Sequence, residues 1–444
     1  MGLSPAAGER SSTLELRLPP QPPSVAAARH RVHDLLVRAG REDLVDTCVL
    51  LVSEVVTNAL LHAGTVMRLR AALGPGGVRV EVRDGSPHLP APRGYATTSG
   101  TGRGLRMLES MVDDWGVTRH EGGKTVWFEV AGEESRAAAR PEVAVRHTDG
   151  HGRSVGHQTT VTVDLLNMPL LLHAAWQEHA EALLREYLLA SLDSDDTDPI
   201  QLHADATDAI AVLEEHTPRS HVWTIHDELF SDAAEPAVSA ALVRIPVPVE
   251  SVPHFETLDR VVGSAAALAE EGQVLTPPTL PAVEEFRRWV CGQVLGQPTG
   301  RAPEPWSVPV DVAREPEPPP GWDDAGVVGA GRGVIAANTA SQIIAVSPEA
   351  ARLLGYDDGA ELVGRRIASI IPQRLRQAHV AGFTMFLLVG RKPLLGSPTV
   401  VPALRRDGSE VDIEILIREQ PLGTGGSVLL ADIGEVGPAV GVAG

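Results

Sequence analysis

The sequence contains few cysteines, few lysines and no long apolar run. Cys48 and Cys291 are the only cysteines among 444 residues, and both lie on apolar stretches with helical spacing. Such cysteines are typical of reduced core residues, so we expect no disulfide framework. Because no run of about 18 apolar residues occurs, we predict no membrane-spanning segment. The first residues lack the apolar core of a secretory signal, and we therefore expect a cytoplasmic protein.

Arginine replaces lysine almost everywhere, and Lys124 and Lys392 are the only lysines. We attribute this bias to a GC-rich coding genome and assign it no physical role. The net charge of −20 is uneven, since residues 136–325 carry 12 basic and 31 acidic side chains. This acidic middle third disfavours nucleic acid and anionic membranes as partners. It either docks a basic partner or keeps the protein soluble, and solubility is the simpler interpretation.

Two segments without apolar periodicity divide the chain. Residues 131–158 are rich in Gly, Ala, Arg and His, and residues 297–324 contain the run PTGRAPEPWSVPVDVAREPEPPPGW. We interpret the first segment as a linker because it lacks apolar periodicity, and the second because its prolines favour extended, semi-rigid backbone. They separate three predicted domains, at 12–132, 159–296 and 325–436. We recognise no internal repeat.

The segment LVSEVVTNALLHAG, residues 51–64, predicts an apolar helix with two polar side chains on one flank. Glu54 and Asn58 are four residues apart, so their side chains are neighbours. Together they could hold a metal-bound phosphate beside a proton acceptor, although on their own a satisfied polar network is the stronger interpretation. The residues expected to face a core recur at helical spacing: Val45, Cys48, Val52, Val55, Ala59 and Ala63.

Three later segments follow this helix in a fixed order. Residues 78–85 read VRVEVRDG, a strand ending in an Asp-Gly turn, and residues 101–105 read TGRGL, a glycine turn that opens a helix. Residues 122–130 read GGKTVWFEV, a threonine followed by a strand. Together the four segments resemble the histidine-kinase and Hsp90 type of ATPase, and most closely the anti-sigma-factor serine kinases. The resemblance covers residues 12–132 and implies an α/β two-layer sandwich that binds ATP.

The resemblance implies roles for the residues of the first two segments. Glu54 would be the general base, and Asn58 would bind Mg²⁺. Asp84 would contact the adenine amino group, with Gly85 allowing close approach. His62, one turn beyond Asn58, fits a surface position better than a phosphate contact.

The remaining roles fall on the later segments. Gly102, Gly104 and the helix start at Leu105 would wrap the phosphates. Arg103 would either contact phosphate or face solvent. Thr125 would support adenine binding, and residues 86–100 would form the lid.

The middle region predicts four helices, and a helical bundle of no recognised family is the natural arrangement. His173 and His179 lie six residues apart, which is too far for a metal pair, and no histidine-kinase phosphoacceptor motif follows them. We expect surface histidines here. The predicted helices are Met168–Leu189, Ile200–Glu215, Ser251–Glu271 and Leu280–Leu295.

Residues 334–365 read VIAANTASQIIAVSPEAARLLGYDDGAELVGR and resemble a PAS domain, an α+β sensor fold. The resemblance predicts a helix after Ser347-Pro348, a long helix from Arg374 and a hairpin around Asp407-Gly408.

His379 stands where haem-binding relatives place their axial ligand. Met385 and Thr399 stand roughly where those relatives hold haem propionates with basic side chains, so we expect a haem-free domain. The domain contains no cysteine, which excludes a flavin–cysteine photoadduct.

These features predict a multidomain cytoplasmic signalling protein: an ATP- and Mg²⁺-dependent serine/threonine kinase regulated by a PAS sensor. The implied substrate is an anti-sigma-factor antagonist, with a sigma factor as a further client and a homodimer as one use of the long helices. One alternative is a nucleotide-dependent binding switch that sequesters its partner without catalysis. Another is an atypical histidine kinase, which the missing phosphoacceptor motif and the reversed domain order disfavour.

Overall fold

The computed structural model falls into two compact units. The first unit combines the chain up to Val161 with Tyr187–Glu215 and Val247–Val261, and the second contains the rest. The linker expected at 131–158 lies almost wholly outside the described residues. The structure describes residues 12–74, 76–86, 111–112, 114–120, 122–132, 159–192, 198–218, 234–308, 310, 318–389, 396–422 and 427–436.

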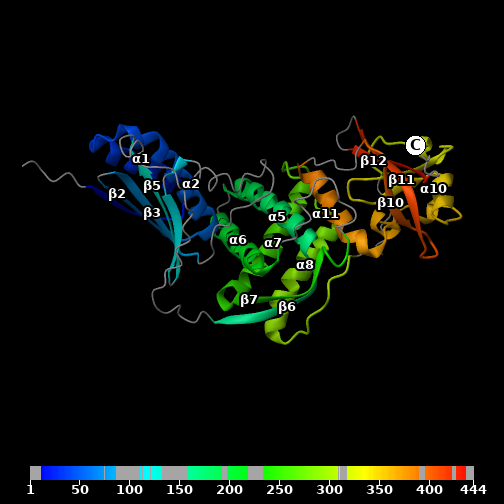
Figure 1. Ribbon diagram of the computed structural model, residues 1–444, viewed down its shortest axis with the longest axis horizontal. Coiled ribbons are helices and arrows are strands. Elements are labelled where there is room, and N and C mark those ends of the chain that lie inside the picture. Colours follow the sequence, from blue (N-terminus) through cyan, green and yellow to red (C-terminus); the bar gives the residue numbers. More distant parts are fainter. Residues whose placement is uncertain are drawn as a thin grey trace, which may run out of the picture. The chain divides into compact units, whose positions relative to one another are not determined.

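The first unit is built on a five-stranded antiparallel sheet in the order β1-β2-β3-β5-β4. Strand β3 alternates strictly: Val78, Val80 and Val82 are buried, while the residues between them face outward. The helices α1 and α2 lie on one side of this sheet (Figure 1) and share its apolar core. The bounds are β1 (Thr13–Leu18), α1 (Pro23–Arg38), α2 (Val45–Ala63), β2 (Met67–Leu73), β3 (Gly77–Asp84), β4 (Asp114–His120) and β5 (Gly123–Ala131).

The apolar face predicted for α2 is confirmed. Cys48 is among its fully buried residues, Ala63 is buried at its end, and Val45 is partly buried. Among the described residues, the stretch Glu42–Ala63 is the one helix long and apolar enough to cross a membrane, by length and composition alone. Its buried side chains pack in the core beneath the sheet.

The C-terminal end of α2 contacts a helix from much later in the chain, α6 (Pro199–His216). Gly64 ends α2 in the left-handed conformation, with φ 59°, and its N–H donates to Leu60 O at 3.2 Å. A Cβ on Gly64 would lie 2.6 Å from the Cβ of Ala204, so only glycine permits this packing. His203 Nδ1 lies 3.0 Å from Leu61 O.

The four predicted helices of the middle region are confirmed within one or two residues at each end, but two strands accompany them. Among the described elements of this region, the strand–helix–helix order occurs twice. Both strands end in proline, and both second helices begin with it. The elements are β6 (Thr160–Pro169), α5 (Leu170–Ser191) and α6, then β7 (Ser239–Pro248), α7 (Val252–Glu270) and α8 (Pro281–Gly296), with β6 and β7 paired.

The histidines of α5 are buried, which corrects the expectation of surface histidines. His173 packs against Trp176 and Phe286, with ring centroids 5.8 and 6.2 Å away. His179 Nε2 lies 2.9 Å from Thr279 Oγ1. Burial lowers the pKa of each imidazole to about 4. Trp289 and Trp306 extend this aromatic cluster.

The C-terminal region forms a second five-stranded sheet, in the order β10-β11-β12-β8-β9. Ser347 caps α10 by accepting a hydrogen bond from Ala350 N at 3.2 Å. Gly408 turns the β10–β11 hairpin with φ 83°, so both local predictions are confirmed. The bounds are α9 (Ala325–Val328), β8 (Gly333–Ala337), β9 (Ile343–Val346), α10 (Pro348–Leu353), α11 (Gln373–Val389), β10 (Thr399–Leu404), β11 (Glu410–Pro421) and β12 (Ser427–Glu435).

Helix α11 packs against the middle region of the same unit. Ala381 and Met385 join a buried apolar cluster with Leu171, Ala175 and Val238. Gln377 Nε2 donates to Glu235 Oε1 at 2.7 Å, and Glu235 N donates to Arg374 O at 2.9 Å. His379 is half-buried on α11, with its Nε2 3.4 Å from Ser341 Oγ and its ring 5.9 Å from that of Phe383.

We predict that acid destabilises the second unit through His173. An unfolded histidine takes up a proton near pH 6.5, whereas buried His173 does so only near pH 4. The unfolded state therefore binds more protons between these values, and stability is lost as pH falls from 6.5 toward 4, by up to about 3 kcal/mol. His173→Leu should lower the pH midpoint of acid unfolding, measured by tryptophan fluorescence. The matched change His30→Leu, at an exposed site on α1, should not; equal shifts would contradict the prediction.

Candidate functional site

A buried ion pair joins the ends of two neighbouring strands of the first sheet. Asp84 is the last residue of β3 and lies directly opposite Lys124 on β5. Lys124 Nζ donates to Asp84 Oδ1 at 3.0 Å, and the two side chains are only 6% and 1% exposed for Lys124 and Asp84. Ser86 N also donates to Asp84 Oδ1, at 2.9 Å. Asp84 is thus enclosed and held by two donors.

The alternation of the strands explains why these charges are buried. Asp84 continues the apolar row of Val78, Val80 and Val82, and Lys124 continues that of Val126 and Phe128. Both side chains therefore point to the face covered by helices. Burial raises the pKa of the Asp84 carboxyl, while the Lys124 charge and the Ser86 N–H act against that rise. Lys124 is the partner that favours ionised Asp84.

Two glycines allow the backbone to pack closely around Asp84. Gly123 has φ 148°, and a Cβ there would lie 1.9 Å from the Asp84 carbonyl oxygen. Gly85 N donates to Thr65 Oγ1 at 2.9 Å, and a Cβ on Gly85 would also lie 2.9 Å from that oxygen. The group that approaches Gly85 in the structure is the Thr65 hydroxyl.

The structure does not bring Thr125 to Asp84. Thr125 lies on the opposite face of the sheet, beside Arg83, and its Oγ1 is 2.8 Å from His120 Nε2. The position facing Asp84 belongs to Lys124, which sequence reasoning treated as a matter of codon composition. The signal was present in GGKTVWFEV, because Lys124 and not Thr125 alternates in step with the buried Val126 and Phe128.

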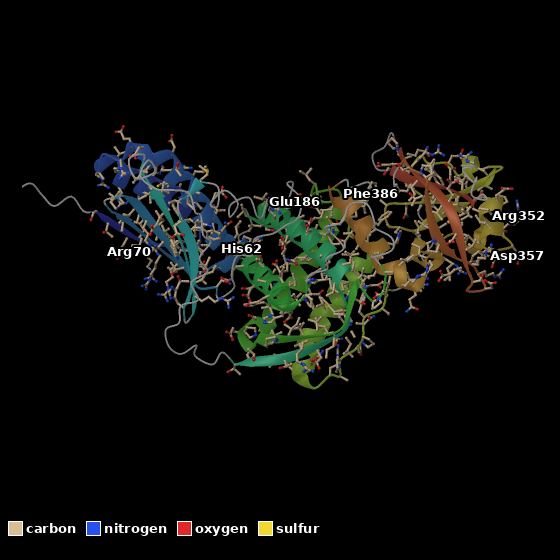
Figure 2. All side chains as sticks on the ribbon, in the orientation of Figure 1. His62, Arg70, Glu186, Arg352, Asp357 and Phe386 are labelled. Atoms are coloured by element: carbon tan, nitrogen blue, oxygen red, sulfur yellow. The ribbon has the colours of Figure 1, made fainter. Side chains whose placement is uncertain are left out.

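Glu54 and Asn58 share a half-buried flank of α2, next to its fully buried face. Neither side chain hydrogen-bonds to any other residue that the structure describes. His62, labelled in Figure 2, is half-buried one turn further along. The glycine-turn residues Gly102, Arg103, Gly104 and Leu105 lie outside the described residues, as does the lid apart from Ser86.

Within the described ranges, no group of three His, Cys, Asp or Glu side chains could hold a metal ion. An ion at Asn58 would therefore not be held by such a cluster within those ranges. That is compatible with Mg²⁺, which usually takes one or two protein ligands together with phosphates and water.

The first unit matches a known family. Residues 18–130 match the family of histidine kinase-like ATPase domains. The matched range contains Glu54, Asn58, Asp84 and Lys124. Comparison with the curated proteins finds no significant match.

Among solved structures, similarities are found to PAS and LOV proteins. The PAS domain of an HTR-like protein from Haloarcula marismortui is 21% identical, with 26% of this chain and 93% of that chain covered and a TM-score of 0.19. The Rhodobacter sphaeroides LOV protein is 15% identical, with 26% and 67% covered and a TM-score of 0.22. An RNA-binding light-oxygen-voltage receptor is 12% identical, with 84% and 77% covered and a TM-score of 0.20.

We predict strong coupling between Asp84 and Lys124. Lys124→Met should leave a buried carboxylate without its countercharge and reduce the free energy of unfolding of the first unit by about 3–5 kcal/mol. The double change Asp84→Asn/Lys124→Met should recover most of that loss, because no charge remains buried. Urea unfolding of the four proteins completes a double-mutant cycle. Additive effects would show that the two side chains do not depend on each other.

Proposed function

We propose that this chain is an ATP-dependent serine/threonine kinase of a signalling pathway, regulated by a C-terminal sensor domain. The observation that carries the proposal is the match of residues 18–130 to histidine kinase-like ATPases. Two features of the structure support it. Asp84 ends a central strand, where this type of domain recognises the base, and Glu54 and Asn58 lie together on α2, which packs against the same sheet.

The residues of the site suit separate tasks. The Asp84 carboxylate is an acceptor for the amino group of adenine. Asn58 would bind Mg²⁺, which neutralises phosphate charge when it is bound. Glu54 would take the proton of the attacking hydroxyl. Its carboxylate makes no hydrogen bond to another described residue that would compete for this role. The glycine turn at Gly102 and Gly104, with Arg103, would contact the phosphates.

We assign Lys124 a positioning role. Burial favours the protonated form of Asp84, and a protonated carboxyl offers one acceptor fewer to the base. Lys124 counters this effect from 3.0 Å away and fixes the carboxylate in one orientation. The lysine thus keeps Asp84 ready to accept a hydrogen bond.

The proposed substrate is a serine or threonine of an anti-sigma-factor antagonist, with a sigma factor as a further client. The C-terminal domain would act as a PAS sensor in a cytoplasmic protein. Its helix α11 shares an apolar cluster with Leu171 and Val238 of the middle region. A change in the sensor could therefore reach the middle helices through α11.

A binding switch is the second candidate function. In our assignment, Glu54 is the single residue that serves phosphoryl transfer and not ATP binding. A binding switch would therefore use all the other residues of the site in the same way as a kinase. Substitution of Glu54 separates the two functions.

Glu54→Gln should retain ATP binding and lose phosphoryl transfer at least a hundredfold, because the proton acceptor is gone. Asn58→Ala should lose both. Calorimetry measures ATP and Mg²⁺ binding, and radiolabelled ATP measures transfer to antagonist-type proteins encoded beside the gene. Acid-stable label identifies phosphoserine or phosphothreonine. Wild-type protein that binds ATP but transfers nothing would support the switch, and an active Glu54→Gln variant would contradict the base assignment.

Lys124→Met should weaken ATP binding at pH 7 at least fivefold and make it pH-dependent. Without the lysine, the pKa of Asp84 should rise further, so affinity should improve as pH increases and the carboxyl ionises. The wild-type protein should show a flat profile between pH 6 and 8. Fluorescence titration with a labelled ATP analogue at several pH values measures both. Equal affinity with two flat profiles would restrict Lys124 to a structural role.

A further inference from the structure

The outer face of the first sheet, opposite Asp84 and α2, carries three arginines in one row. Arg17 on β1 lies directly opposite Arg68 on β2, and Arg68 lies directly opposite Arg83 on β3. All three side chains are exposed. Neighbouring strands are about 4.8 Å apart, so the backbone positions of the three arginines lie within about 10 Å across the sheet. We call these residues the arginine row.

The adjacent rows of the same face are neutralised. Arg70, labelled in Figure 2, lies 3.7 Å from both Glu15 and Glu81. Arg79 contacts Glu81 at 2.8 Å and Glu129 at 2.7 Å. The arginine row has no ion pair with any residue that the structure describes. Like charges directly opposite each other on neighbouring strands are destabilising, so the row weakens the sheet that carries it.

We propose that the arginine row binds a short acidic segment of a partner protein. Guanidinium groups match carboxylates with two parallel hydrogen bonds, and three of them side by side favour a local cluster of acidic side chains. The row continues into Thr125 and Thr118, whose hydroxyls lie in register with it on β5 and β4. This surface is separate from the nucleotide site, because it occupies the other face of the sheet.

The surroundings favour a short segment over an extended polyanion. Glu15 and Glu81 border the row on β1 and β3, and the whole chain has a net charge of −20. Both features repel a nucleic acid or an anionic membrane, whose charge extends well beyond three strands. A few carboxylates can contact the row without crossing the neighbouring acidic side chains.

The test compares two double variants of the full chain. Arg68→Gln/Arg83→Gln removes two charges from the row, and Arg70→Gln/Arg79→Gln removes two charges from the same strands and the same face. The probe is a fluorescein-labelled peptide of ten residues rich in Asp and Glu, followed by anisotropy at low and physiological salt. The row variant should bind at least tenfold more weakly than wild type, and the control variant within threefold of it.

Thermal unfolding shows whether a loss of peptide binding results from misfolding of a variant. The row variant should melt at the same temperature as wild type or higher, because repulsion within the row is relieved. Equal loss of peptide binding in both variants, or no binding by the wild type at low salt, would overturn the proposal. A DNA oligonucleotide or phosphatidylserine vesicles that bind the row more tightly than the peptide would assign it to another class of partner.

Discussion

A buried carboxylate stays ionised only when a countercharge lies within reach, and the first sheet is organised around this constraint. Asp84 and Lys124 meet because β3 and β5 pair in one register, and a slip of one residue would place Lys124 among the outer arginines. Gly123 has no side chain because the Asp84 carbonyl occupies that space. The register also decides that Thr125 faces outward. The Asp84–Lys124 ion pair therefore depends on the register of β3 and β5 and on the glycine at position 123.

Much of the fold could be predicted because the apolar periodicity of a helix is visible within a short segment of sequence. The predicted helix Leu280–Leu295 and the observed α8, Pro281–Gly296, differ by one residue at each end. Strand β6 was missed because its apolar residues run directly into those of α5, without a break in polarity between Met168 and Leu170. The buried position of His173 depends on Phe286, more than a hundred residues away, so no local pattern could reveal it.

The candidate site was predictable where it depends on one helix and unpredictable where it depends on two strands. Glu54 and Asn58 are neighbours by helical spacing alone, and the structure places them on one flank of α2. The partner of Asp84 depends on strand register, which no single segment contains. Alternation within GGKTVWFEV was sufficient to choose Lys124 over Thr125 for the buried face. The same alternation separates the apolar face from the arginine row.

The packing of α6 on Gly64 has a consequence for how the protein folds as it is made. The sheet of the first unit is complete when Ala131 leaves the ribosome, but α6 begins only at Pro199. At roughly 5–20 residues per second, several seconds of translation separate the two. During that interval the end of α2, with the half-buried Leu61 and the space beside Gly64, has no α6 to cover it. The helix α2, which carries Glu54 and Asn58, is therefore fully packed only after α6 has been synthesised, which is later than the whole sheet of the first unit.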